Sequence, residues 1–230
     1  MAITKQSTVF TGEQPNSTNT ELNISCTPSP DPDCVICIVA QGQTGTDRVG
    51  TVTYGGSTMT EMSLSPSGQG SSTEAGTVHA FIDTSPATGN QTCSIGSGGN
   101  KGCAAAVIML NGTAPFSEVD TSVLTSAAYT NGTVTLSLGG ETSFCAFGWM
   151  AGRADIADVS PKTGWTSDHE YGLGNQTLGI YSYDTIASTD VEAGADTIGG
   201  PDDFVLLAVA VKEAAGTSIP IFQNYYRQQS

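Results

Sequence analysis

The chain has 230 residues, 38% of them hydrophobic, and its 22 acidic and seven basic side chains give a formal net charge of −15. Its length suits one large all-β domain or two small ones, and its apolar content suffices for a core without crosslinks. The Lys and Arg residues are scattered singly, so the sequence offers no basic stripe for nucleic acid, and docking on an anionic membrane is disfavoured as well.

The first twenty residues are polar and rich in Ser, Thr and Asn, and we expect a flexible N-terminal arm at residues 1–20. The first twelve lack the apolar centre of a secretory leader, and no apolar run is long enough for a membrane-spanning helix. We therefore expect a soluble protein that is either cytoplasmic or leaves the cell without such a leader, and that binds no membrane and no nucleic acid.

Short apolar segments separated by turn residues predict β-strands along the rest of the chain. Leu22, Ile24 and Cys26 alternate with polar residues, which is the period of a half-buried strand. Residues 34–40 are apolar throughout, as in a strand covered on both faces. Residues 51–60 place a Gly-Gly turn between two strands, which predicts a hairpin.

The downstream part of the chain continues in the same way. Residues 104–110 and 204–211 are again apolar throughout. Roughly ten strands, spaced as in a sandwich or jelly roll, predict a single jelly-roll-like antiparallel β-sandwich over residues 21–213. Residues 151–174 and 187–200 are expected to be long loops, and no internal repeat is apparent. The expected core residues on facing sheets are Val134, Leu136, Leu138, Phe147, Trp149, Leu206 and Val209.

The six cysteines do not form a metal-binding pattern. Cys34 and Cys37 have suitable spacing but lie in an apolar strand, where a metal site would need a turn. Cys26 and Cys34 flank a Pro-rich loop, and Cys93 and Cys103 flank a Gly-rich loop. Either pair could form a disulfide in an oxidising compartment, and buried free thiols are the alternative. The cysteines expected to stay reduced in core strands are Cys37 and Cys145.

Neither histidine belongs to a catalytic pattern. His79 lies in mid-strand beside Phe81 and is interpreted as structural. His169 has a carboxylate on each side, in Asp168-His169-Glu170, which could support general-base chemistry, but no Gly-x-Ser-x-Gly elbow accompanies it. We interpret this triplet as part of an exposed loop. We assign no catalytic residue and no cofactor, and we expect a protein that is not an enzyme.

Three pairs of aspartates at turns could bind calcium through carboxylate oxygens, although none forms an EF-hand loop. These pairs are Asp31/Asp33, Asp155/Asp158 and Asp202/Asp203. Acidic turn residues are common in any acidic protein, so we assign no metal site.

The C-terminal tail, residues 214–230, differs from the segments before it. After a linker at 214–218, apolar and aromatic side chains concentrate outside the predicted strands. The tail either folds back over a sheet edge or docks on a neighbouring subunit, because such a segment is normally not left in water. Its expected interface residues, which include the adjacent arginine, are Ile219, Ile221, Phe222, Tyr225, Tyr226 and Arg227.

The order of these motifs resembles a known family. Residues 53–60 read Thr-Tyr-Gly-Gly-Ser-Thr-Met-Thr, and residues 203–211 read Asp-Phe-Val-Leu-Leu-Ala-Val-Ala-Val. Over residues 34–213 the chain resembles jelly-roll-like domains of tailed-bacteriophage structural proteins and of some bacterial surface proteins. Met59 and Phe204 stand where those domains usually have Leu and Trp. The family has no catalytic signature to transfer.

The resemblance implies a head-decoration, head-fibre or tail-associated protein that is typically oligomeric. We therefore expect a virion component, made in the host cytoplasm, that contacts other copies of itself and other virion proteins of the capsid or tail. The alternative is a carbohydrate-binding or adhesin-type module for a glycan on the host surface. In that case the long loops would bind the glycan, with Trp165, Tyr171, Tyr181 and Tyr183 as stacking platforms.

Overall fold

The computed structural model of the chain is all-β. It describes residues 3–15, 20–42, 49–62, 76–97, 102–112, 115–129, 132–152, 160–173, 176–197 and 202–213. Every regular element in these ranges is a strand, and every strand pairing is antiparallel. These ranges contain no helix that is long and apolar enough to cross a membrane. The predicted all-β class is confirmed.

The strands divide between the two halves of the chain. The first half contains β1 (Thr4–Lys5), β2 (Phe10–Gln14), β3 (Glu21–Cys26), β4 (Cys34–Gln41), β5 (Val49–Tyr54), β6 (Ser57–Thr58), β7 (Thr60–Glu61), β8 (Thr77–Asp83), β9 (Gln91–Ser97) and β10 (Cys103–Asn111). The second half contains β11 (Phe116–Tyr129), β12 (Gly132–Ser137), β13 (Thr142–Ala151), β14 (Ser160–Pro161), β15 (Thr166–Leu173), β16 (Gln176–Ala187), β17 (Asp190–Thr197) and β18 (Asp202–Glu213).

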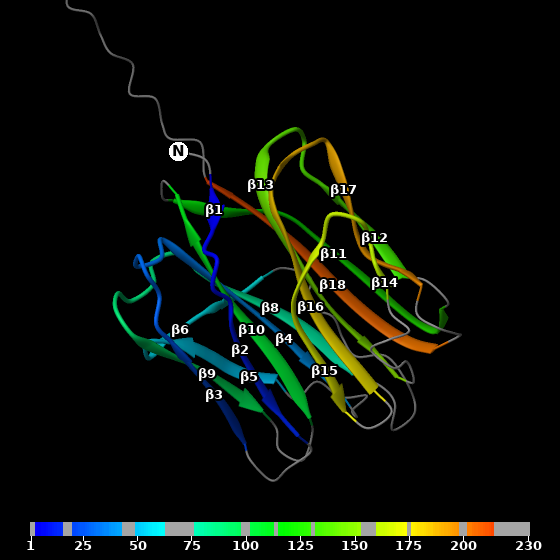
Figure 1. Cartoon of the computed structure of the whole chain (residues 1–230), viewed down its shortest axis with the longest axis horizontal. Coiled ribbons are helices and arrows are strands. Elements are labelled where there is room, and N and C mark those ends of the chain that lie inside the picture. Colours follow the sequence, from blue (N-terminus) through cyan, green and yellow to red (C-terminus); the bar gives the residue numbers. More distant parts are fainter. Residues whose placement is uncertain are drawn as a thin grey trace, which may run out of the picture.

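The strands of the described ranges form four sheets. These sheets are stacked as four layers, which follow one another from left to right in Figure 1. The first half supplies a first outer sheet, β3-β9-β5-β6, and a first inner sheet, β1-β10-β4-β8-β7, in which β2 also pairs with β10. The second half supplies a second inner sheet, β11-β18-β13-β16-β15, and a second outer sheet, β12-β17-β14. Residues 3–112 therefore make a first sandwich, and residues 115–213 make a second.

Each sandwich has the strand order of a jelly roll. In the first, β2 pairs with β10, β3 with β9 and β4 with β8, so strands pair from the two ends of the segment inwards. In the second, β11 pairs with β18, β12 with β17 and β13 with β16. A jelly roll folds two Greek keys into two packed sheets in this manner. The predicted jelly-roll-like sandwich is confirmed, and the structure divides the predicted span into two of them.

The two sandwiches also match in register. Residues 34–41 lie opposite 110–103 across β4 and β10, as residues 144–151 lie opposite 211–204 across β13 and β18. The β4/β8 and β13/β16 pairs agree in the same way, as do β3/β9 and β12/β17. The sequence shows no apparent repeat, whereas the structure shows a duplication.

Three cores fill the spaces between the four layers of the described residues. On β4, Ile36 and Ile38 point into a central core between the two inner sheets, whereas Val35 and Cys37 point into a first core beneath the first outer sheet. A second core lies between the second inner and outer sheets. The predicted core residues are all buried: Val134, Leu136, Leu138, Phe147, Trp149, Leu206 and Val209.

A glycine allows the inner sheets to approach each other closely. Gly148 of β13 lies against the first inner sheet, and a Cβ atom added to it would be 2.7 Å from Ile38 Cγ2 and 2.8 Å from Val78 Cγ1. Such distances are shorter than any ordinary van der Waals contact. A side chain at this position would therefore push the inner sheets apart.

The N-terminal segment is not a free arm. β1 and β2 pair with β10, and Ile3 is buried in the central core with 1% of its surface exposed. Phe116, at the start of β11, closes the same core from the second sandwich. The polar composition of residues 3–15 misled the prediction because a strand at a sheet edge buries only a few of its side chains.

Two segments that were expected to be loops contain strands. β14 and β15 lie within residues 151–174, and β17 occupies most of residues 187–200. In β17 the buried residues include Val191, Ala193 and Ala195, two of which are small, so the apolar alternation is weak. Together with further strands elsewhere, such as β1, β2, β9 and β11, they bring the strands in the described ranges to eighteen, above the roughly ten expected.

Candidate functional site

A polar groove of about 690 Å³ opens at one end of the first sandwich. Its walls are the segment around β1, the loop at residues 29–33 and the end of β10. Gln6 connects these walls, because its Nε2 donates to the carbonyl of Pro30 at 2.9 Å and to Asn111 Oδ1 at 2.8 Å. Asn111 Nδ2 in turn donates to the carbonyl of Asp31 at 2.9 Å. The polar groups of the walls thus hold one another in place.

The aspartates beside this groove bind backbone amides. Asp31 Oδ1 accepts a 2.6 Å hydrogen bond from the amide of Gly89, and Asp33 Oδ2 accepts one of 2.9 Å from the amide of Gly112. Both carboxylates therefore fasten the Pro-rich loop to its surroundings. Among the described residues no group of three or more His, Cys, Asp or Glu side chains is arranged to hold a metal ion. The residues Asp155 and Asp158, and the side chains of Asp202 and Asp203, lie outside what the structure describes.

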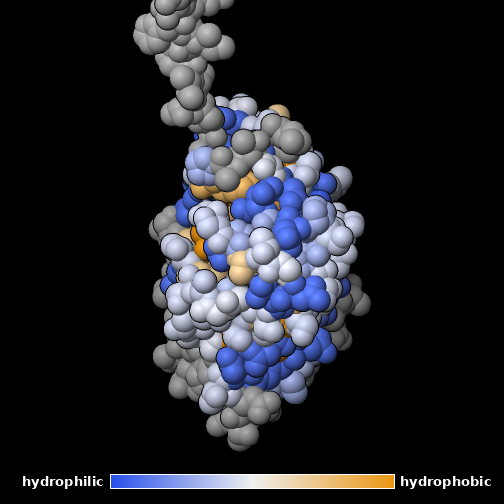
Figure 2. Space-filling model, turned by 90° about the vertical axis from the view of Figure 1, so that its left-hand side faces the viewer, coloured by the Kyte–Doolittle hydropathy of each residue, from blue (hydrophilic) through white to orange (hydrophobic). Residues whose placement is uncertain are grey.

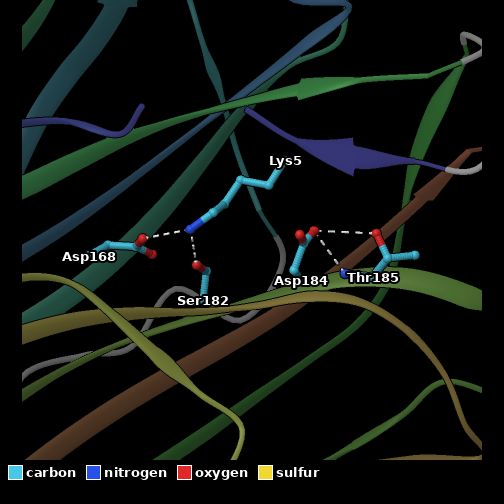
Figure 3. Close-up of polar contacts among 5 residues, drawn as sticks. All are labelled: Lys5, Asp168, Ser182, Asp184 and Thr185. Carbon is cyan, nitrogen blue, oxygen red and sulfur yellow. Dashed lines mark hydrogen bonds and ion pairs between the residues drawn. The ribbon is translucent and has the colours of Figure 1, made fainter. Parts of the chain in front are cut away.

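A polar seam joins β1 and β2 of the first sandwich to β15 and β16 of the second. Lys5 Nζ lies 2.8 Å from Asp168 Oδ1 and donates a 2.7 Å hydrogen bond to Ser182 Oγ (Figure 3). The side chains of Lys5 and Asp168 are 13% and 3% exposed. Because charges withdrawn from water are tolerated only when they are paired, this contact ties the first strand to the second sandwich.

A further hydrogen bond holds the N-terminal segment on β16. Thr185 Oγ1 donates to the carbonyl of Ile3 at 2.6 Å. Asp184 Oδ1 accepts a 3.0 Å hydrogen bond from the amide of Thr185, and the hydroxyl oxygen of Thr185 lies 3.3 Å from the same carboxylate oxygen (Figure 3). The backbone of the first residues is thereby anchored beside the buried ion pair of Lys5.

Each histidine lies beside a glutamate from another strand. His79 is 2% exposed, with Nδ1 2.7 Å from Glu61 Oε1, and its ring stacks near Phe81. His169 Nε2 lies 3.7 Å from Glu13 Oε2. Burial lowers the pKa of His169, although Glu13 and the neighbouring Glu170 act in the opposite direction. The imidazole is therefore neutral at pH 7 and helps to close the seam.

The triplet at residues 168–170 is part of a strand, which corrects the expected exposed loop. Its two carboxylates have separate partners: Asp168 pairs with Lys5, whereas Glu170 Oε1 accepts hydrogen bonds of 2.5 Å from Tyr181 Oη and 3.1 Å from Ser167 Oγ. Burial, followed by the bond to Glu170, raises the pKa of Tyr181. Contacts of this kind stabilise packing between strands, and they place neither carboxylate against the imidazole.

The six cysteines, all in described ranges, are buried free thiols. The disulfides that the sequence suggested, Cys26 with Cys34 and Cys93 with Cys103, are not formed. Cys26 faces the first core and Cys34 the central core, so they lie on opposite sides of the first inner sheet. Cys93 contacts Cys37 instead, with the two Sγ atoms 3.9 Å apart. Burial raises the pKa of Cys26 to about 12 and of Cys103 to about 11.

Two of the four aromatic residues suggested as sugar-stacking platforms are buried. Trp165 and Tyr181 are 8% and 1% exposed, and both pack on Phe147, with ring centroids 4.6 and 4.9 Å away. Both rings belong to the second core, because the turn at residues 162–165 is short and connects two strands, β14 and β15. Only Tyr171 and Tyr183 remain partly exposed.

The interface residues expected in the tail lie outside the described residues; they are Ile219, Ile221, Phe222, Tyr225, Tyr226 and Arg227. Comparisons with protein-family models, with curated proteins and with solved structures found no match. The function is therefore inferred from the residues of this chain.

The polar seam is the feature that the sequence did not reveal. Lys5 and Asp168 are separated by 163 residues, and neither belongs to a local motif that marks a buried charge. The only signal is a single lysine in an N-terminal segment whose one other charged residue is Glu13. A lone lysine does not indicate which carboxylate it will pair with. The pair with Asp168 can be recognised only in the structure, where the two sandwiches are stacked.

Proposed function

We propose that the chain is a structural component of a bacteriophage virion, exposed on the particle surface as a capsid-decoration, head-fibre or tail-associated protein. The observation that carries this proposal is the tandem of jelly rolls, whose inner apolar faces cover each other. Jelly rolls recur in viral capsid proteins, where a rigid sandwich presents its outer faces and loops. The motifs at residues 53–60 and 203–211 support the same assignment through their resemblance to phage structural domains.

The inner sheets supply the rigidity that such a role needs. Ile36 and Ile108 of the first inner sheet and Val205 and Leu207 of the second are 0–2% exposed, within one continuous core. Burial of apolar surface on this scale is the main stabilising contribution in folding. The tandem therefore behaves as one rigid body.

The outer sheets are suited to an aqueous exterior. On the first outer sheet, a row of polar side chains crosses four strands through Asn23, Ser94, Thr53 and Thr58. Figure 2 shows this side of the molecule, which is mainly white and blue with little orange. The second outer sheet exposes acidic residues in place of hydroxyl groups, and they are Asp190, Glu192 and Asp196. Net negative charge of this size favours solubility of a protein displayed at high local concentration.

In this proposal the C-terminal tail, residues 214–230, makes the contacts that hold the assembly together. Its aromatic and apolar side chains are of the types that anchor protein interfaces. We assign it to contacts with other copies of this chain and with the capsid or tail beneath them. The polar outer sheets then remain free to face the solvent.

Immunogold labelling tests the virion assignment. Antibodies raised against the recombinant chain are applied to intact virions purified by density gradient from a lysate that contains the protein. We expect gold particles on the exterior of intact virions, and the protein in the virion band. Absence of label, with all of the protein in the soluble fraction, would contradict the proposal.

A deletion tests the role of the tail. The variant that lacks residues 217–230 should keep the far-UV spectrum and melting temperature of the full chain but lose its oligomeric state in light scattering. A variant that lacks only residues 228–230 keeps the apolar segment and serves as the matched control. A monomeric full-length chain, or unfolding of the longer deletion, would show that the tail belongs to its own sandwich and not to an interface.

A further inference from the structure

Two thiols face each other inside the first sandwich. Cys37 lies on β4 of the first inner sheet and Cys93 on β9 of the first outer sheet, and their Sγ atoms are 3.9 Å apart. Both side chains are 0% exposed, and both belong to the first core. The pair therefore bridges the two layers of the sandwich at a place where no water or ligand separates the sulfur atoms.

We propose that Cys37 and Cys93 form a disulfide-forming site, which crosslinks the two sheets of the first sandwich when the protein meets a low-molecular-weight disulfide such as oxidised glutathione. A disulfide needs its sulfur atoms about 2.05 Å apart. The two Sγ atoms are 3.9 Å apart, so they must move closer by roughly 2 Å. Rotation of both cysteine side chains can provide this movement.

A neighbouring thiol makes the choice of partner specific. Cys26 lies on β3 of the same outer sheet as Cys93, because Ile24 pairs with Cys93 and Gln91 with Cys26. The Sγ of Cys26 donates to the carbonyl of Ile24 at 3.6 Å. Cys93 thus has two thiol neighbours. Cys37 lies across the core in direct contact with it, and Cys26 lies diagonally on the next strand of the same sheet. The contact between sulfur atoms favours the bond across the core.

The second sandwich has no counterpart of this site. By register, Phe147 of β13 occupies the place of Cys37, and β17, the strand that corresponds to β9, contains no cysteine. Phe147 fills its place with a ring that stacks on Tyr181. The proposed crosslink therefore lies in the core of the first sandwich only. The core of the second sandwich, which lacks the thiol pair, serves as an internal control.

The chemistry balances with one molecule of oxidised glutathione. One protein thiolate attacks a glutathione sulfur, forms a mixed disulfide and releases the first reduced glutathione. The second protein thiolate attacks the protein sulfur of that mixed disulfide and releases the second. The protein loses two protons and two electrons, and the two glutathione molecules accept them.

Burial sets the rate of this reaction. Hydrogen bonding to Cys93, together with burial, raises the pKa of Cys37 well above its usual value, so the thiolate that must attack is scarce in the folded protein. Exchange then proceeds through openings of the first sandwich, or during folding. A protein that folds in a reducing cytoplasm would keep the thiols and acquire the bond after release.

Peptide mapping of the full-length chain tests the site. The protein is opened in urea near its unfolding midpoint with oxidised and reduced glutathione, diluted to refold, alkylated and digested without reduction. We expect linked peptides that join Cys37 to Cys93, while Cys34 and Cys145 are alkylated. The crosslinked chain should melt higher than the thiol form, by on the order of 10 °C.

Variants define the outcomes. Cys26→Ala and Cys145→Ala should still form the crosslink and show the rise in melting temperature, whereas Cys37→Ala should show neither. The proposal is overturned if Cys26 joins Cys93 in the wild-type chain, if linkages are scattered among several cysteines, or if all six cysteines remain alkylated after refolding. Mapping of the wild-type chain decides among these outcomes even if one variant does not fold.

Discussion

The first and second sandwiches share a topology and a register, yet they fill their cores with different side chains. The first has Cys37, Val39, Met59 and Phe81 where the second has Phe147, Trp149, Trp165 and Tyr181, respectively. The smaller residues leave the first core with a pair of thiols in contact, and the larger ones give the second core a stack of aromatic rings. The jelly roll thus tolerates large changes of side chain as long as each core is filled.

The outer sheets differ as much as the cores do. In the first outer sheet β9 carries Thr92 and Ser94 on its solvent side, whereas β17, the corresponding strand of the second outer sheet, exposes Asp190 and Glu192. The second outer sheet therefore exposes more carboxylates than the first, and two of them, Glu192 and Asp196, pair with Lys162. Solvent-facing positions of a strand accept such exchanges because they contribute little to packing. The charge of the outer surface has therefore diverged between the two sandwiches, whereas their topology has not.

The largest expected contrast comes from equivalent core positions. Phe147→Ala removes a ring packed between Tyr181 and Trp165, and it should lower the free energy of unfolding by about 3–5 kcal/mol. Cys37→Ala, at the same register position, removes a single sulfur atom and should lower it by about 1 kcal/mol. Urea unfolding followed by tryptophan fluorescence measures both. If both variants lost the same free energy of unfolding, the expected difference between the two cores would be contradicted.

Two aliphatic residues should behave alike, which tests the equivalence itself. Ile24 and Leu136 are buried residues of the corresponding strands β3 and β12, and they are 4% and 0% exposed. Truncating either to Ala should lower the free energy of unfolding by about 2–5 kcal/mol. Calorimetry of the two variants gives the comparison. A Leu136→Ala chain with unchanged stability would count against the second sandwich.

The polar seam should contribute a smaller but specific amount. Lys5→Met leaves the carboxylate of Asp168 buried without its cation, and it should lower the free energy of unfolding by about 2 kcal/mol, because some water reaches the pair. The double variant Lys5→Met/Asp168→Leu should recover most of that loss. Lys212→Met, which breaks a more exposed pair with Glu141, is the matched control and should change stability by less than about 1 kcal/mol. A double variant no more stable than Lys5→Met would contradict a buried ion pair.

The smallest effect is a pH dependence at His169. Burial lowers its folded-state pKa below the usual 6.5, so the neutral form is favoured on folding. Its contribution to stability is full above pH 6.5 and is lost as the pH falls from there through the lowered pKa. The charges of Glu13 and Glu170 act in the opposite direction and reduce this loss. His169→Gln should therefore flatten the decline of melting temperature between pH 7 and pH 5, and an unchanged decline would exclude His169 as its source.

The sequence predicted the fold class and most of the core because alternation and turn residues are local signals. The alternation around Leu136 and the apolar runs of β4 and β18 are examples, and the structure buries all of them. The number of sandwiches was missed although a signal was present. A sheet in a single two-layer sandwich has one exposed face, so strands buried on both faces require a further layer. Residues 34–41 and 204–211 are such strands.

The duplication and the seam were hidden for different reasons. Matching positions carry different residue types, such as Cys37 and Phe147, so a comparison of letters finds no repeat. Lys5 and Asp168 meet only because the two inner sheets stack, and nothing in the neighbourhood of either residue encodes that contact. Patterns of burial along each strand are predictable, whereas contacts between distant strands depend on how the sheets are assembled.

Cleavage between the two sandwiches tests the central claim most directly. A protease site placed between Gly112 and Pro115 is cut in the folded full-length chain, and the product is examined by size exclusion with light scattering and circular dichroism. We predict that both fragments stay together as one β-rich species, separate in denaturant and reassociate on refolding, because the central core holds two complete jelly rolls face to face. Separation of the fragments in native buffer, or loss of β-structure on cleavage, would contradict the account.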